Sequence, residues 1–148
     1  IFFFLLFTYG KFGLTFISLF TLFLFMFGAV FGLWISGFTV GLTAILGLIG
    51  LFGITVRNVI LMFQHAEQRF TVEGWPAREA AYDAGKRRMI PIFLTSAAAS
   101  TGVVPLILSG SSFWAPVGIV IFAGGIFLLF MTITILPVLY WKLNDSKK

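Results

Sequence analysis

A single cation stands inside the segment "GLFGITVRNVILMF", which is otherwise free of charged residues. Arg57 follows Gly53 by four residues and precedes four apolar side chains at positions 59–62. A guanidinium group is a permanent cation that can pair with a carboxylate but cannot release its proton at a working pH. The chemistry open to Arg57 is therefore that of a fixed counter-ion, which needs an acid opposite it.

The position of Arg57 predicts a deep location in a membrane. Glu67 is the next residue with a permanent charge, ten residues further on, which is about 15 Å along a helix and roughly half of a hydrocarbon core. If the helix leaves the lipid at Gln64 and His65, the depth falls to about 10 Å and snorkelling becomes conceivable. Because a lipid-facing guanidinium is costly, we favour an inward-facing, paired Arg57, with snorkelling or purely structural pairing as the alternative.

The acidic residues offer Arg57 no partner within the apolar runs. All five lie in polar stretches: Glu67, Glu73, Glu79, Asp83 and Asp145. An intramembrane cation needs an anion. We therefore expect the counter-ion to come from a longer chain or from another subunit.

Small and hydroxyl-bearing residues accompany this cation. Gly47, Gly50 and Gly53 recur every three residues toward Arg57, which predicts a smooth helix face that a neighbouring helix can approach closely. The same glycines are also compatible with helix packing that has no further function. The hydroxyl groups at positions 95, 96, 100 and 101 could bond the carbonyl four residues earlier, and we expect His65 to lie at the membrane interface.

Composition fixes the broad class. The chain has 148 residues, of which 59% are hydrophobic and 10% charged, far from the roughly 25% charged residues of soluble domains. No cysteine is present, so disulfides and thiolate metal sites are excluded, and we expect neither a metal nor a cofactor. The basic residues fall between the apolar runs, which gives the formal charge of +5 a membrane explanation and leaves nucleic-acid binding without support.

The apolar runs predict an all-α membrane protein. Spans of this length cannot be strands, and a helix satisfies its own backbone hydrogen bonds in lipid. We expect one transmembrane helical bundle over residues 1–148, and we read Ile1 as a cut inside a longer protein. The predicted elements are a truncated helix at 1–8 and four complete spans at 14–34, 39–66, 90–108 and 116–141.

The polar stretch 67–88 predicts a cytoplasmic loop containing a short amphipathic helix. Pro76 suits a helix start, Glu79 an early turn, and the cations at 86–88 a late one. Trp75 would anchor this helix at the interface. Nine basic residues fall on one side of the membrane: Lys11, five within this loop and three lysines after position 141. The positive-inside rule therefore makes the loop and the C-terminus cytoplasmic.

Several ordered motifs resemble the closing third of a resistance-nodulation-division (RND) efflux transporter of the multidrug type. They are "GLFGITVRNVILM", "EAAYDAGKRRMIPIFLTS", "GVVPLIL", "FWAPVGIVIFAGGI" and "TILPVLYW", which together span essentially the whole chain. The resemblance implies a multi-pass protein of the bacterial inner membrane that is a proton antiporter and not an enzyme. It also implies a homotrimer that works with a periplasmic adaptor and an outer-membrane channel.

The resemblance also assigns roles. In such pumps an intramembrane pair of aspartates exchanges protons beside a basic residue and a threonine. Matching the motifs places Arg57 at the basic position with Asn58 beside it, Thr95 at the threonine position, and Arg88 at the cytoplasmic entrance. The usual drug-exporting pattern has Lys where this chain has Arg57, so titration would belong to the aspartates alone.

Two functions from different classes are compatible with the sequence. The first is part of a proton-driven pump that exports drugs or other amphiphiles, with heavy-metal or lipid export as variants within the superfamily. The second is a stand-alone helical membrane scaffold or channel-like subunit, in which Arg57 pairs with a neighbouring chain. The sequence does not identify a cargo.

Overall fold

The computed structural model describes residues 1–145, and its elements are helical. In chain order they are α1 (Phe2–Tyr9), α2 (Phe12–Ser36), α3 (Leu42–Glu67), a π-helical extension η1 (Gln68–Val72), α4 (Ala77–Leu108) and α5 (Trp114–Asp145). Lys147 and Lys148, on which the predicted orientation partly depends, lie outside the described residues. Within the described part, α2, α3 with η1, α4 and α5 are long and apolar enough to cross a membrane. The predicted all-α membrane class is therefore confirmed.

The short helix predicted within the 67–88 loop is not a separate element. Residues 77–88 are helical, and Pro76 stands directly before the helix as expected, but α4 continues without a break through residue 108. The residues from Lys86 to Met89 are good helix formers, and nothing between them forces a turn. Pro91 removes one backbone donor inside α4 and is nevertheless accommodated there.

Helix α2 carries its aromatic side chains outward. Its exposed phenylalanines follow a spacing of three or four residues, which is one helical face: Phe12, Phe16, Phe20, Phe23, Phe27 and Phe31. The opposite face buries Ser18 and Thr21, whose hydroxyls donate to backbone carbonyls of the preceding turn at 2.8 Å. Hydroxyls inside and large apolar groups outside are the reverse of a soluble helix, and they fit a helix surrounded by lipid.

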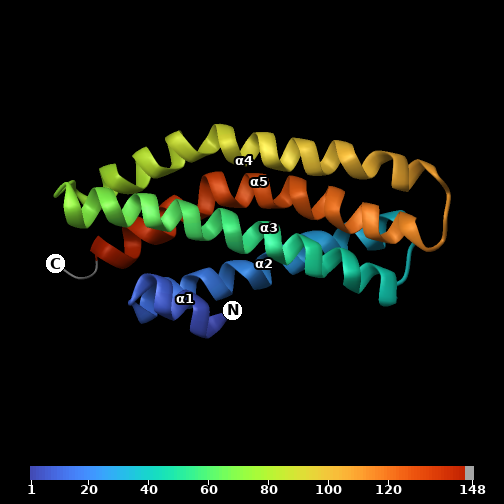
Figure 1. Cartoon of the computed structure of the whole chain (residues 1–148), viewed down its shortest axis with the longest axis horizontal. Helices are drawn as coiled ribbons and strands as arrows, with labels where there is room; N and C mark the ends of the chain where they lie inside the picture. Colours follow the sequence, from blue (N-terminus) through green and yellow to red (C-terminus); the bar gives the residue numbers. More distant parts are fainter. Residues whose placement is uncertain (146–148) are drawn as a thin grey trace.

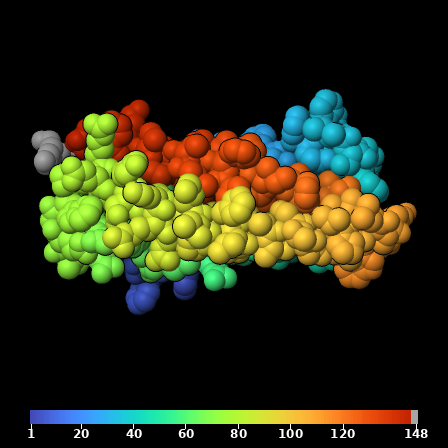
Figure 2. Space-filling model, turned by 90° about the horizontal axis from the view of Figure 1, so that it is seen from above, coloured from blue at the N-terminus to red at the C-terminus, as the bar shows by residue number. Residues whose placement is uncertain are grey.

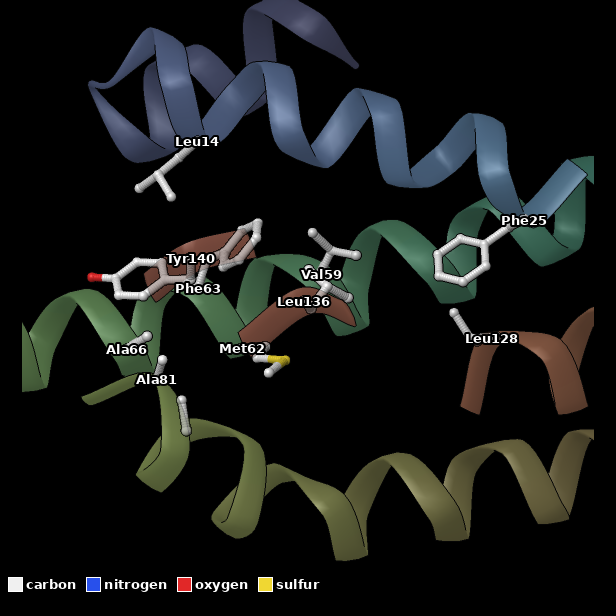
Figure 3. Packing of buried hydrophobic residues seen from close by; sticks show 11 residues of the cluster. Leu14, Phe25, Val59, Met62, Phe63, Ala66, Ala81, Leu128, Leu136 and Tyr140 are labelled. Carbon is white, nitrogen blue, oxygen red and sulfur yellow. The ribbon is translucent and has the colours of Figure 1, made fainter. Parts of the chain in front are cut away.

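Helix α5 is the centre of the bundle, because it packs against α2, α3 and α4 (Figure 1). Near the end of the bundle that holds the 67–77 connection, Phe63 of α3 stacks on Tyr140 of α5 with ring centroids 5.9 Å apart (Figure 3). Phe25, Leu128 and Leu136 belong to the same buried cluster. On the surface shown in Figure 2, α4 runs the length of the molecule with α5 beside it.

Glycines allow α2 and α5 to approach closely. A Cβ atom added at Gly32 would lie 2.3 Å from the Cβ of Ala123, and one at Gly28 would lie 2.5 Å from the ring of Phe127. Gly28 and Gly32 are four residues apart, as are Ala123 and Phe127, so both pairs lie on one contact line. Such small-residue contacts replace the hydrophobic driving force that helices lack in lipid.

Candidate functional site

The four residues predicted for a proton relay line one small cavity. Arg57 and Asn58 come from α3, and Arg88 and Thr95 come from α4; the cavity has a volume of about 40 Å³. On each helix the spacing is what brings the side chains together. Arg88 and Thr95 are seven residues apart, which places them on the same face two turns from each other.

Arg57 lies near the middle of its helix. It follows the first residue of the 26-residue helix α3 by 15 positions and precedes the last by ten. Its side chain is exposed in the described bundle. No carboxylate of residues 1–145 lies within ion-pair distance of the guanidinium group, in keeping with the acids' positions in the sequence.

The glycine stripe beside Arg57 divides into two parts. A Cβ at Gly47 would meet the backbone oxygen of Val117 and the side chain of Val120 at 3.1 Å, so this glycine serves the packing of α3 on α5. Added Cβ atoms at Gly50 and Gly53 would meet no atom of the described residues within 4 Å. The face that leads to Arg57 is therefore smooth and uncovered by residues 1–145.

Asn58 contributes a buried donor. Its side chain is 4% exposed, and its Nδ2 atom has no hydrogen-bond partner in the described part of the chain. A buried amide without partners costs free energy, so such a group in a native structure calls for an explanation. Because Asn58 lines the same cavity as Arg57, a polar group that entered the cavity could satisfy it.

Thr95 adopts the local hydrogen bond that the sequence left open as an alternative. Its hydroxyl donates to the carbonyl of Pro91 at 2.8 Å, one turn earlier in α4. The oxygen keeps lone pairs with which it can accept a further hydrogen bond inside the cavity. The bond fixes the rotamer of Thr95 and leaves its acceptor function free.

A network of charged side chains links α3, η1 and α4 at the end of the bundle that holds the 67–77 connection. Asp83 of α4 accepts from Arg87 at 3.1 Å, contacts Arg69 at 3.2 Å, and lies 3.2 Å from the Nε2 atom of His65. Burial raises the pKa of Asp83, but hydrogen bonds from Arg87 and His65, together with the positive charges of Arg87 and Arg69, hold that pKa below its ordinary value. His65 thus has a carboxylate as its hydrogen-bond partner, a contact that its sequence position alone does not predict.

Three contacts at this end could not be predicted from the sequence. Glu67 pairs with Lys11 and accepts a hydrogen bond of 2.8 Å from the hydroxyl of Tyr140. These partners are 56 and 73 residues away along the chain, so no local spacing signals them. Trp75, expected as an interface anchor, lies with its ring centroid 4.9 Å from the guanidinium carbon of Arg69.

Comparison with known sequences shows the family to which the chain belongs. Residues 1–144 match the sequence pattern of the AcrB/AcrD/AcrF family. The chain belongs to this family. It is therefore a segment of RND-type membrane transporter sequence, and the resemblance seen in its motifs is confirmed.

Individual members of the AcrB/AcrD/AcrF family agree with the match. The chain is 33% identical over 145 residues to the swarming motility protein SwrC of Bacillus subtilis, covering 95% of this chain and 14% of that protein. It is also 33% identical over 124 residues to the multidrug resistance protein MdtC of Erwinia amylovora, covering 82% of this chain and 12% of that protein. The MdtC protein of Erwinia tasmaniensis shows the same identity and coverage. The chain thus spans only a small part of the length of these relatives.

Proposed function

We propose that this chain is part of the transmembrane domain of a proton-driven efflux pump that exports drugs or other amphiphilic compounds. The observation that carries the proposal is the shared cavity of Arg57, Asn58, Arg88 and Thr95. Two relatives carry the name multidrug resistance protein, which supports amphiphilic cargo over heavy metals. The family match over residues 1–144 favours a transporter over a stand-alone scaffold.

Arg57 acts in this proposal as a fixed counter-ion. The uncovered face with Gly50 and Gly53 receives a further helix of the transporter, which carries the intramembrane pair of aspartates. Charged aspartates attract the guanidinium, and protonated ones release it, so the protonation state selects between two packings of α3. Asn58 and Thr95 supply a donor and an acceptor within the same cavity, and Arg88 marks its cytoplasmic side.

The rest of the pump supplies the substrate-handling regions. In line with the family, we propose a homotrimer in the inner membrane that works with a periplasmic adaptor and an outer-membrane channel. The 67–77 connection and the C-terminus face the cytoplasm, because the cations of the described chain other than Arg57 lie toward that end.

Transport should depend on the proton gradient. Cells that express the full-length transporter are expected to accumulate less of a fluorescent amphiphilic dye than cells with an empty vector. A protonophore should raise accumulation to the empty-vector level, because the aspartates then have no gradient to titrate against. The same cells depleted of ATP, but with an imposed pH gradient, serve as the control and should still export. Export that continues after the protonophore would contradict proton coupling.

The orientation can be tested by labelling single cysteines. Ser36→Cys and Ser112→Cys, at the charge-free ends of the helices, should react in intact cells with a membrane-impermeant maleimide. Val72→Cys is a matched control, because Val72 is 77% exposed but lies in the cation-rich connection. It should react only after the cells are opened. Labelling of Val72→Cys in intact cells would reverse the proposed orientation.

A further inference from the structure

A groove between α4 and α5 lies away from the relay cavity, at the cation-rich end of the bundle. It has a volume of about 490 Å³ and is formed by the first turns of α4 and the last turns of α5. Side chains of both helices line it, among them Arg78, Glu79, Tyr82, Pro137, Val138 and Trp141.

The groove joins an apolar floor to a charged rim. Pro137 and Val138 belong to the apolar part of α5, and Val138 is 54% exposed. The apolar run of α5 ends at Trp141, which is followed by Lys142. Tyr82, on the α4 side, is 71% exposed and Trp141 is 38% exposed. Aromatic rings at the boundary between apolar and charged sequence are typical of the lipid headgroup level.

Arg78 is held at this rim without an acidic partner. Its guanidinium carbon lies 5.8 Å from the ring centroid of Trp141, a cation–π distance. Among residues 1–145, no carboxylate forms an ion pair with Arg78, although Glu79 also lines the groove. Lys86 follows on the same helix two turns later, and Lys142 adjoins Trp141. The lining of the groove thus holds one cation, Arg78, and one acid, Glu79, and Lys86 and Lys142 add positive charge further along the same two helices.

We propose that this groove binds one anionic phospholipid. The lipid phosphate pairs with the planar guanidinium of Arg78, which can bind it through two hydrogen bonds. The hydroxyl of Tyr82 donates to the same headgroup, and one acyl chain covers Pro137 and Val138. Charge complementarity selects an anionic headgroup over a zwitterionic one. Lipid binding here needs the bundle to lie in a membrane but does not rest on the proton relay.

Trp141 provides a direct probe of the groove. The purified full-length transporter is reconstituted into vesicles of phosphatidylcholine or phosphatidylglycerol, each with and without bromine on the acyl chains, because bromine quenches tryptophan fluorescence at contact. Subtracting the signal of Trp141→Phe isolates the fluorescence of Trp141 from that of the other tryptophans. Competition between brominated and unbrominated lipids then gives the relative affinity of the groove for the two headgroups.

The expected result is a preference of about fivefold for phosphatidylglycerol at Trp141, the value typical of one basic residue near an anionic surface. Arg78→Gln should reduce the preference to about one, and Arg78→Lys should retain most of it. Arg87→Gln is the matched control, because Arg87 is an exposed cation of the same helix that lies outside the groove and pairs with Asp83. It should keep the parental preference.

Three outcomes would overturn the proposal. Equal quenching by both lipids would mean that the groove does not distinguish an anionic headgroup from a zwitterionic one. If the preference for phosphatidylglycerol survives in Arg78→Gln, or is lost equally in Arg87→Gln, it comes from the cationic surface in general and not from the groove. Absence of quenching by either lipid would mean that protein covers Trp141. None of these outcomes bears on proton-coupled efflux, so this proposal and the proposed function can fail separately.

Discussion

Replacing Arg57 with Ala in the full-length transporter is expected to reduce proton-coupled efflux by about tenfold or more. In the proposed pump Arg57 forms a buried ion pair with the aspartates, and removing one partner of such a pair costs about 3–5 kcal/mol. The facing carboxyl groups would lose a fixed cation, which raises their pKa and leaves them protonated through the cycle. Asn58, Arg88 and Thr95 would remain in the cavity, but the cation contributed by α3 would be lost. The measurement is dye efflux per correctly inserted transporter.

A graded series separates charge from packing at this position. Arg57→Lys keeps a cation but loses the planar fork, so it should retain more activity than Arg57→Ala. Thr95→Ala removes one hydroxyl and should reduce efflux less than Arg57→Ala. Arg87→Ala removes an exposed cation outside the cavity and should pump at nearly the parental rate. If Arg57→Ala also pumps at the parental rate, Arg57 only packs or snorkels, and its relay role is wrong.

The helical class and the spans could be predicted from the sequence because lipid leaves the backbone few choices. An apolar run of about 20 residues must become a helix when no water is present to satisfy its peptide groups. Three of the four predicted spans accordingly fall within α2, α4 and α5, and the span predicted at 39–66 begins three residues before α3. The boundaries at the polar end could not be predicted equally well. Residues 77–88 are charged and favour a helix, and nothing in their composition says whether that helix stops before Ile90 or continues.

The candidate site was predictable where its signal is local. The seven-residue spacing of Arg88 and Thr95 and the isolation of Arg57 can be read along the chain, whereas the facing of α3 and α4 at one cavity is a tertiary fact. Contacts between distant residues left no such signal. Tyr140 donates to Glu67 across 73 residues, and the sequence shows only two polar residues near the ends of apolar runs.

The contact between α2 and α5 is likewise absent from any local pattern. Gly32 is one of 16 glycines in the chain, and only the structure shows which of them have a neighbour where a side chain would be. A Cβ atom at Gly32 would lie 2.3 Å from the Cβ of Ala123, whereas carbon atoms pack comfortably at about 3.5–4.0 Å. Since Ala123 Cβ has no torsion that could move it aside, the helix backbones would have to separate.

Gly32→Ala is therefore expected to destabilise the transporter by about 1–3 kcal/mol, the usual cost of overpacking. Thermal unfolding of the purified protein, followed by its helical circular dichroism, measures the effect. Gly102→Ala is the matched control within a helix, because an added Cβ there meets no atom of the described residues within 4 Å. That change should stabilise the protein by about 0.5–1 kcal/mol, since alanine loses less backbone entropy than glycine.

The opposing residue gives the decisive comparison. Ala123→Gly removes the methyl group that the new Cβ of Gly32→Ala would strike, so the double variant should recover most of the lost stability. Alone, Ala123→Gly should be mildly destabilising, because it loses a contact and adds backbone freedom. The coupling between the two changes should thus be large and favourable, as expected for residues in direct contact. If the loss of stability in the double variant equals the sum of the losses in the single variants, α2 and α5 do not meet at this pair. The close approach of the two helices inferred here would then be wrong.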